Sequence, residues 1–182
     1  MYNDIQVIAE VKTVSPFGWR SPQTWDELFE TAVRIGDIIS VHTDLRWGGS
    51  CKLIEKARRL TSKPILAKGI HADDADIREA LDCGADLVLV VGRTPKIELT
   101  RCLIEPATLA GLHRIPTGCR VVWNSRDLAT GGLKRETFGE ARHLFPGWLC
   151  QASNLKTVED IHPEANAVLV GTHLPTFAES LQ

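Results

Sequence analysis

A carboxylate, an ammonium and a hydroxyl crowd the end of the first apolar run of the chain. Glu10 and Lys12 close this run, which begins at Val7, and Ser15 follows in the next loop. In a parallel α/β barrel the C-terminal ends of the strands form the active face. Groups of these types there could exchange protons or hold a charged ligand. An isolated Glu10–Lys12 pair could equally be a structural ion pair, so later strand ends decide the interpretation.

Polar side chains recur where later apolar runs end. They are Trp47 beyond the second run, Lys68 after the third, Glu105 at the fifth, Asn124 and Arg126 after the sixth, Ser153 after the seventh, and Gly171 and Thr172 after the eighth. A lysine beside other cations and apolar walls has a lowered pKa and can act as a general acid. A turn that leads into a helix can bind phosphate through its N–H groups, and barrels commonly bind phosphate after their last two strands.

Each of these groups also has a structural interpretation. Lys68 could be a surface lysine with a buried stem, Glu105 could cap the helix that follows it, and Asn124 could belong to a polar turn. His42 and His71 are interpreted as structural and are left out of the predicted site. The recurrence of polar groups at successive strand ends favours a shared site.

Eight short apolar runs alternate with helical stretches. The predicted strands are 5–11, 37–41, 64–67, 86–91, 101–105, 119–123, 147–150 and 167–170. Such alternation indicates a parallel sheet, because parallel strands need crossover connections. Eight repeats favour a closed (β/α)8 barrel. The alternative is an open doubly wound sheet, but residues 13–18 do not form the Gly-rich phosphate loop that it would require.

The predicted helices are 25–35, 48–60, 72–83, 107–113, 133–144, 157–161 and 173–181. Thr24 is a candidate N-cap of the first, and residues 94–100 have room for only one or two turns. A chain of 182 residues is shorter than the roughly 200–250 of typical barrels. We therefore expect a single trimmed barrel domain over residues 1–182, with short or missing helices around the fourth and fifth strands and no N-terminal extension.

Composition narrows the class of partner. The hydrophobic content is 43%, the charged content 24% and the net charge −2, which is ordinary for a globular protein and argues against nucleic acid or an anionic membrane as a partner. No apolar run approaches about 18 residues, and the N-terminus has no signal-peptide pattern. We expect a cytoplasmic protein that binds a small molecule. A shortened helical shell would expose apolar surface, so a homo-oligomer is one expected state.

The cysteines and histidines do not form a metal-binding or disulfide pattern. The five cysteines are odd in number, widely spaced and without a C-x-x-C pair, which predicts reduced, mostly buried thiols. The six histidines are scattered, so no dedicated metal site is predicted.

Taken together, the motifs resemble those of indole-3-glycerol phosphate synthase, the tryptophan-biosynthesis barrel. The segments that carry the resemblance are IAEVK at 8–12, ISVHTD at 39–44, WGGS at 47–50, PILAK at 64–68, GAD at 84–86, NSRDL at 124–128, LKT at 155–157 and VLVG at 168–171. The resemblance implies a carbon–carbon lyase of the carboxy-lyase type without cofactor or metal. Its substrate would be 1-(2-carboxyphenylamino)-1-deoxyribulose 5-phosphate, which is closed, decarboxylated and dehydrated to indole-3-glycerol phosphate.

The resemblance also assigns roles to the catalytic candidates. Lys68 matches the general acid that protonates the sugar oxygen during ring closure, and Lys12 matches the lysine near the substrate carboxylate. Glu105 matches the glutamate of proton transfer in dehydration. Glu10 and Asn124 match residues that position the hydroxyl and amine region of the substrate.

The predicted substrate-binding residues are Ser15, Trp47, Arg126, Ser153, Gly171 and Thr172. Among them, Ser153, Gly171 and Thr172 match the phosphate-binding turns, and Trp47 matches an aromatic wall for the anthranilate ring.

Two motifs depart from the family pattern. Gly69-Ile70 follows Lys68 where the family has Asp-Phe, and Ala152 stands where the family has a glutamate. About forty residues usually precede the first strand in the family, whereas six precede Val7 here. The alternative function is therefore a divergent or non-catalytic barrel that binds another phosphorylated ligand. A third candidate, phosphoribosylanthranilate isomerase, would need a cysteine at the end of the first strand.

Overall fold

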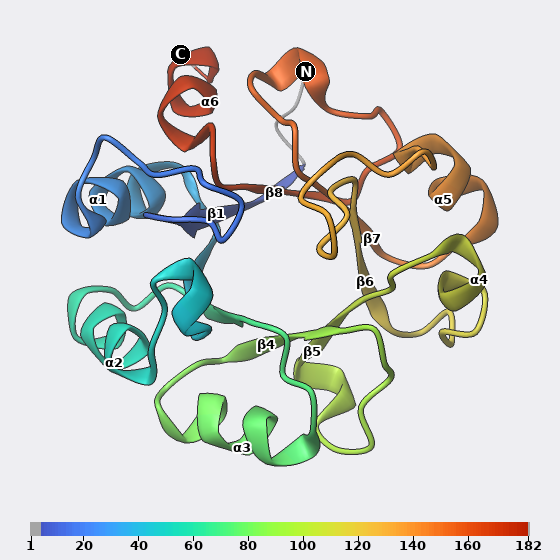
Figure 1. Ribbon diagram of the computed structural model, residues 1–182, viewed down its shortest axis with the longest axis horizontal. Coiled ribbons are helices and arrows are strands. Elements are labelled where there is room, and N and C mark those ends of the chain that lie inside the picture. The colour runs from blue at the N-terminus through green and yellow to red at the C-terminus, as the bar shows by residue number, and fades with distance from the viewer. Residues whose placement is uncertain (1–4, 182) are drawn as a thin grey trace.

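Eight parallel strands close into a barrel in the computed structural model, which describes residues 5–181 (Figure 1). The strands are β1 (Gln6–Val11), β2 (Ile38–His42), β3 (Ile65–Lys68), β4 (Leu87–Val91), β5 (Cys102–Glu105), β6 (Arg120–Asn124), β7 (Leu149–Ala152) and β8 (Ala167–Val170). Each strand pairs with the next in sequence, and β8 pairs with β1. The prediction of a closed (β/α)8 barrel is confirmed, and the open sheet was the wrong alternative.

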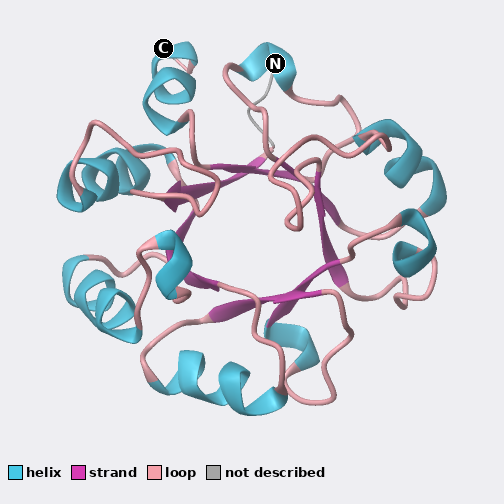
Figure 2. Cartoon of the chain, in the orientation of Figure 1, coloured by secondary structure: helices cyan, strands magenta, loops and turns pink. Residues whose placement is uncertain are grey.

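Helices surround this barrel incompletely. Within the described chain the α-helices are α1 (Trp25–Ile35), α2 (Cys51–Leu60), α3 (Asp74–Asp82), α4 (Leu109–Leu112), α5 (Phe138–Leu144) and α6 (Leu174–Ser180). Only single 3-10 turns, at Leu99–Arg101 and Val158–Asp160, lie between β4 and β5 and between β7 and β8. The barrel is therefore trimmed, as predicted, and Figure 2 shows these turns as short helical pieces that loops join to the ring of strands. No helix among the described residues is long and apolar enough to cross a bilayer.

The first helix shows how local sequence sets the element boundaries. Thr24 caps α1 in a reciprocal capping box with Glu27, as expected for an N-cap threonine. Gly36 ends the helix, and a Cβ at this position would lie 2.8 Å from Ala32 O and 2.8 Å from Ala9 Cβ. Only glycine fits, because the chain must turn directly from α1 into β2 against the neighbouring strand.

Side-chain alternation along the strands separates the outer core from the barrel interior. In β1, Val7, Ala9 and Val11 pack outward beneath the helices, whereas Ile8 points inward. The inward set forms an apolar floor of Ile8, Ile38, Leu66, Leu89, Leu103, Val122, Cys150 and Leu169. Because the period is two, the next inward position on each strand lies above this floor. The strands therefore deliver their last inward side chains to one mouth.

Several helices were predicted too long, and the predictions over 133–144 and 157–161 show why. The helix predicted over 133–144 begins at Phe138, where Thr137 forms a capping box with Glu140. Leu133 instead pairs with Arg126 in an isolated antiparallel bridge, and it is 67% exposed. The apolar spacing thus included a residue that belongs to a loop. Similarly, the helix predicted over 157–161 is a single 3-10 turn at Val158–Asp160.

The prediction that all five cysteines are reduced was also wrong. Cys51, the first residue of α2, forms a disulfide with Cys83, which caps the C-terminus of α3, with Cα atoms 5.7 Å apart. Cys102, Cys119 and Cys150 are free and buried, as expected. Sequence spacing could not predict the bridge, because it depends on how α3 approaches the start of α2 in space.

Candidate active site

A cavity at the C-terminal ends of the strands brings together nine of the eleven predicted site residues. They are Glu10, Lys12, Trp47, Lys68, Asn124, Arg126, Ser153, Gly171 and Thr172. Strands and loops far apart in the sequence thus converge on one mouth, as the closed topology requires. Glu105 and Ser15 are not among the lining residues.

Glu10 is the centre of the charged cluster. It is buried at the end of β1, and its Oε1 lies 2.5 Å from His42 Nε2 and 3.4 Å from Lys68 Nζ. Burial alone would raise the pKa of Glu10, but the charges of Lys68 and Lys12 and the hydrogen bond from His42 outweigh it and hold the pKa far below its usual range. Glu10 is therefore ionised at neutral pH and acts as a hydrogen-bond acceptor.

Lys68, at the end of β3, faces two carboxylates from other strands. Burial disfavours its ammonium, but the charges of Glu10 and Glu105 overcome burial and raise the pKa of Lys68 above its ordinary value. This is opposite to the lowered pKa that a lysine among cations would have. Lys68 is therefore a charged ammonium at neutral pH, and it carries a proton that it can donate to a substrate oxygen.

Lys12 follows β1 directly and reaches the end of the neighbouring strand, β8. Its Nζ donates to Thr172 Oγ1 at 3.1 Å and lies 5.2 Å from the centre of the Trp19 ring. Burial lowers the pKa of Lys12, and the nearby charges of Lys68 and Arg126 lower it further against the opposing effect of Glu10. The positive charges of Lys12, Lys68 and Arg126 together favour an anion that would bind among them.

A hydrogen-bonded network connects β5, β6 and the loop after β7. Asn124 Nδ2 donates to Glu105 Oε1 at 2.9 Å, and Asn124 Oδ1 accepts from Ser153 Oγ at 2.7 Å and from the Arg126 N–H at 3.0 Å. Burial raises the pKa of Glu105, although Lys68 and Asn124 oppose this effect. Glu105 is thus a buried carboxyl group beneath the cavity, whereas Ser153 stands at its edge.

The backbone of the loop after β7 is unusual. Ser153 and Asn154 both adopt left-handed conformations, with φ of 71° and 58°. In turns of this kind successive N–H groups can converge on an anion. Gly171 and Thr172 line the same cavity from the end of β8. A Cβ on Gly171 would lie 2.6 Å from Glu10 Cδ and closer still to the carboxylate oxygen, so glycine leaves the space that Glu10 occupies.

Trp47 and Ser15 lie in the loops above the mouth. Trp47 is buried at the end of a 3-10 turn (Leu45–Trp47) and stacks parallel to His42, with ring centres 6.0 Å apart. Its edge also contacts Phe17. Ser15 Oγ accepts from the Phe17 N–H at 3.2 Å, so in this structure it supports its own loop instead of facing the cavity.

Sequence reasoning left out one residue of this cluster, His42. The spacing along the strand could have identified it, because Ser40 and His42 follow the inward-facing Ile38 at intervals of two and so face the barrel interior as well. His71, which was left out with it, lies elsewhere: its Nε2 is 3.1 Å from Thr43 Oγ1 and its Nδ1 is 2.5 Å from Leu89 O.

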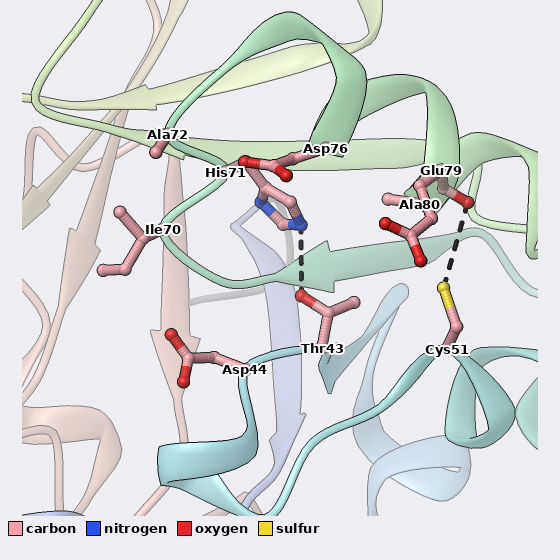
Figure 3. Close-up of a pocket in the computed structure, with 9 residues that line it drawn as sticks. All are labelled: Thr43, Asp44, Cys51, Ile70, His71, Ala72, Asp76, Glu79 and Ala80. Atoms are coloured by element: carbon pink, nitrogen blue, oxygen red, sulfur yellow. Dashed lines mark hydrogen bonds between the residues drawn. The ribbon is translucent and has the colours of Figure 1, made fainter.

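His71 belongs to a second cavity of about 270 Å³, between the loops that follow β2 and β3 (Figure 3). This cavity shares no lining residue with the mouth, and its walls include the carboxylates of Asp44, Asp76 and Glu79. Among residues 5–181, no group of three or more His, Cys, Asp and Glu side chains is arranged to hold a metal ion.

Comparison with known proteins gives one consistent result. A family model described as indole-3-glycerol phosphate synthase matches residues 2–115. The chain is 32% identical to the indole-3-glycerol phosphate synthase of Leifsonia xyli over 97% of this chain and 75% of that protein. It is also 32% identical to the enzyme of the same name from Rhodococcus opacus, over 96% and 74% of the two chains. The enzyme of this name from Bacteroides thetaiotaomicron is 34% identical over 61% of this chain and 44% of its own.

Proposed function

The chain belongs to the indole-3-glycerol phosphate synthase family, and we propose that it catalyses the family's reaction. Its substrate is then 1-(2-carboxyphenylamino)-1-deoxyribulose 5-phosphate, a small anion that carries both a phosphate and a carboxylate. The product is indole-3-glycerol phosphate. The observation that carries the proposal is the buried group of Glu10, Lys68 and Lys12 at the mouth of the barrel, with Asn124 and Ser153 beside it.

The arrangement of charges orients this substrate. The left-handed turn at Ser153 and the residues Gly171 and Thr172 form the phosphate end, with Arg126 supplying positive charge. Lys12 holds the substrate carboxylate near the reacting carbons. The aromatic face of Trp47 walls the anthranilate ring, which buries apolar surface on binding. Ser15 would contact the substrate only if its loop rearranges.

Lys68 and Glu105 carry the proton transfers. In ring closure, the aromatic carbon that bears the carboxylate attacks the ribulose carbonyl carbon, and Lys68 gives a proton to the carbonyl oxygen. The bond to the carboxylate then breaks, CO₂ leaves, and the electron pair restores the aromatic ring. The new hydroxyl leaves as water with a proton from the site, and the neighbouring carbon loses a proton. Glu105 exchanges a proton in this last step through Lys68, whose charge interacts with it.

One position supports the alternative of a non-catalytic relative that binds another phosphorylated ligand. Ala152 faces the barrel interior beside Asn124 and provides no carboxylate to the cavity. Under the enzymatic proposal, Ala152→Glu raises the rate of turnover, because it adds a hydrogen-bond acceptor and proton carrier within the mouth. Under the alternative, this variant remains inactive.

The deciding experiment supplies the purified protein with 1-(2-carboxyphenylamino)-1-deoxyribulose 5-phosphate and follows indole fluorescence. Calorimetry with the same compound measures binding separately. Turnover supports the enzymatic proposal, whereas binding without turnover supports the non-catalytic alternative. The absence of both contradicts the assignment of the substrate.

A further inference from the structure

His42 is a buried histidine inside the charged cluster that the proposed reaction does not use. It lies at the end of β2 with 4% of its surface exposed, and it does not line the cavity itself. Its Nε2 is 2.5 Å from Glu10 Oε1, and its ring is parallel to that of Trp47. The residue thus contacts one member of the site and is covered by another.

The protonation of this pair follows from what each atom can donate or accept. Glu10 is ionised and only accepts, so the proton in the short contact must be on His42 Nε2. His42 Nδ1 is buried and has no hydrogen-bond partner among the described residues. A second proton there would be a buried donor without an acceptor, which is costly. Burial lowers the pKa of His42 despite the opposing charge of Glu10, so the ring remains neutral with its proton on Nε2.

We propose that His42 is a positioning residue that acts through Glu10: its Nε2–H holds the Glu10 carboxylate ionised and in place when the substrate draws Lys68 away. This inference rests on the proposed function for the role of Lys68. It assigns a role to a residue that takes no direct part in the proposed reaction steps.

The arrangement of partners around Glu10 supports this assignment. The charged or titratable groups that face it are Lys12 on its own strand, His42 on β2, Lys68 on β3 and Glu105 on β5. Lys68 and Lys12 both turn toward substrate oxygens during the reaction, and their charges then stabilise the Glu10 carboxylate less. Glu105 is an acid and repels it. His42 is the donor that has no second partner, and Trp47 prevents its ring from swinging away.

The pH dependence of turnover tests the role of the Nε2–H. In His42→Leu the carboxylate of Glu10 loses a charge-assisted hydrogen bond, so its pKa rises and the acid limb of kcat, which reports the enzyme–substrate complex, moves up by about one pH unit. In His42→Gln the amide nitrogen can donate from nearly the same place, and the limb returns toward the wild-type position. His71→Asn is the matched control, because it removes a buried histidine outside the mouth and keeps a donor toward Leu89 O.

A second measurement needs no substrate, so it separates this inference from the proposed function. Nitrogen-15 NMR of the ligand-free protein reports which ring nitrogen of His42 carries the proton, and carbon-13 NMR reports the titration of Glu10. We expect the Nε2–H form throughout pH 5–8 and a higher pKa of Glu10 in His42→Leu but not in His71→Asn. The proposal is overturned by an Nδ1–H tautomer, by a His42 ring that titrates near its ordinary value, or by equal acid limbs in the Leu and Gln variants.

Discussion

Gly171→Ala tests the packing of the site at its tightest point. The added Cβ would lie 2.6 Å from Glu10 Cδ and 3.3 Å from Glu10 Cγ, and it would overlap the carboxylate oxygen. Gly171 does not have a positive φ, so its backbone can accept alanine without strain. The substitution therefore probes the contact with Glu10 alone.

The magnitude follows from two opposing effects. Replacing glycine at a compatible position stabilises by about 0.4–1 kcal/mol through the unfolded chain. Overpacking a buried contact costs about 1–3 kcal/mol. We therefore expect Gly171→Ala to lower the free energy of unfolding by about 1–2 kcal/mol. Glu10 would also shift from His42 and Lys68, so kcat/KM would fall with stability.

A double-mutant cycle isolates the contact. Glu10→Ala removes Cγ, Cδ and the carboxylate oxygens, which are the atoms that a Cβ on Gly171 would meet, and so removes the overlap. In that background Gly171→Ala should become neutral or stabilising. Gly118→Ala is the matched control, because a Cβ there meets nothing within 4 Å, and it should stabilise both backgrounds equally. Urea unfolding followed by tryptophan fluorescence measures the free energy of unfolding of each variant. An equal cost of the Gly171→Ala substitution in both backgrounds would refute this account of Glu10 and Gly171.

Three further variants test the charges and the disulfide. Glu10→Gln should lower stability at pH 7, because the lowered pKa of Glu10 contributes stability above its unfolded value of about 4.3 that is lost as the pH falls through the folded value. Glu105→Gln should raise stability at pH 7. The raised pKa of Glu105 favours folding only below about 4.3, and this advantage is lost as the pH rises through the folded value. Urea titrations at pH 4 and pH 7 measure the stability of both variants, and stability changes of the same sign in both would contradict the assigned pKa directions. Replacing Cys51 and Cys83 together by serine should cost about 3–4 kcal/mol for the 32-residue separation that the disulfide closes, and a reductant should destabilise the wild type but not this variant.

The fold and most of the residues at the barrel mouth could be predicted from the sequence, and the reason is physical. Strand alternation and the count of eight repeats favoured a closed parallel barrel, and closure places Glu10, Lys68 and Asn124 on one face whatever the details of the helices. These residues could be assigned to the barrel mouth because their positions depend only on the alternation of side chains along each strand and on the order of the strands.

Features that depend on tertiary distances could not be predicted in this way. The Cys51–Cys83 bridge depends on how two helices approach each other. The pairing of His42 with Glu10 depends on strand register, because an inward histidine at that position could also have been a neutral core residue. Ser15 was expected at the mouth from its distance along the chain, but its loop folds on itself through Phe17.

The most direct test of the central claim compares turnover by Lys68→Ala with that of the wild type. The matched control is Lys52→Ala, which removes an exposed lysine from α2 outside the site. With 1-(2-carboxyphenylamino)-1-deoxyribulose 5-phosphate at saturation, the loss of a general acid predicts a rate of indole-3-glycerol phosphate formation about 10²–10⁴-fold lower for Lys68→Ala. Lys52→Ala should retain the wild-type rate. Equal rates for Lys68→Ala and the wild type would contradict the assignment of Lys68 as the acid of the reaction.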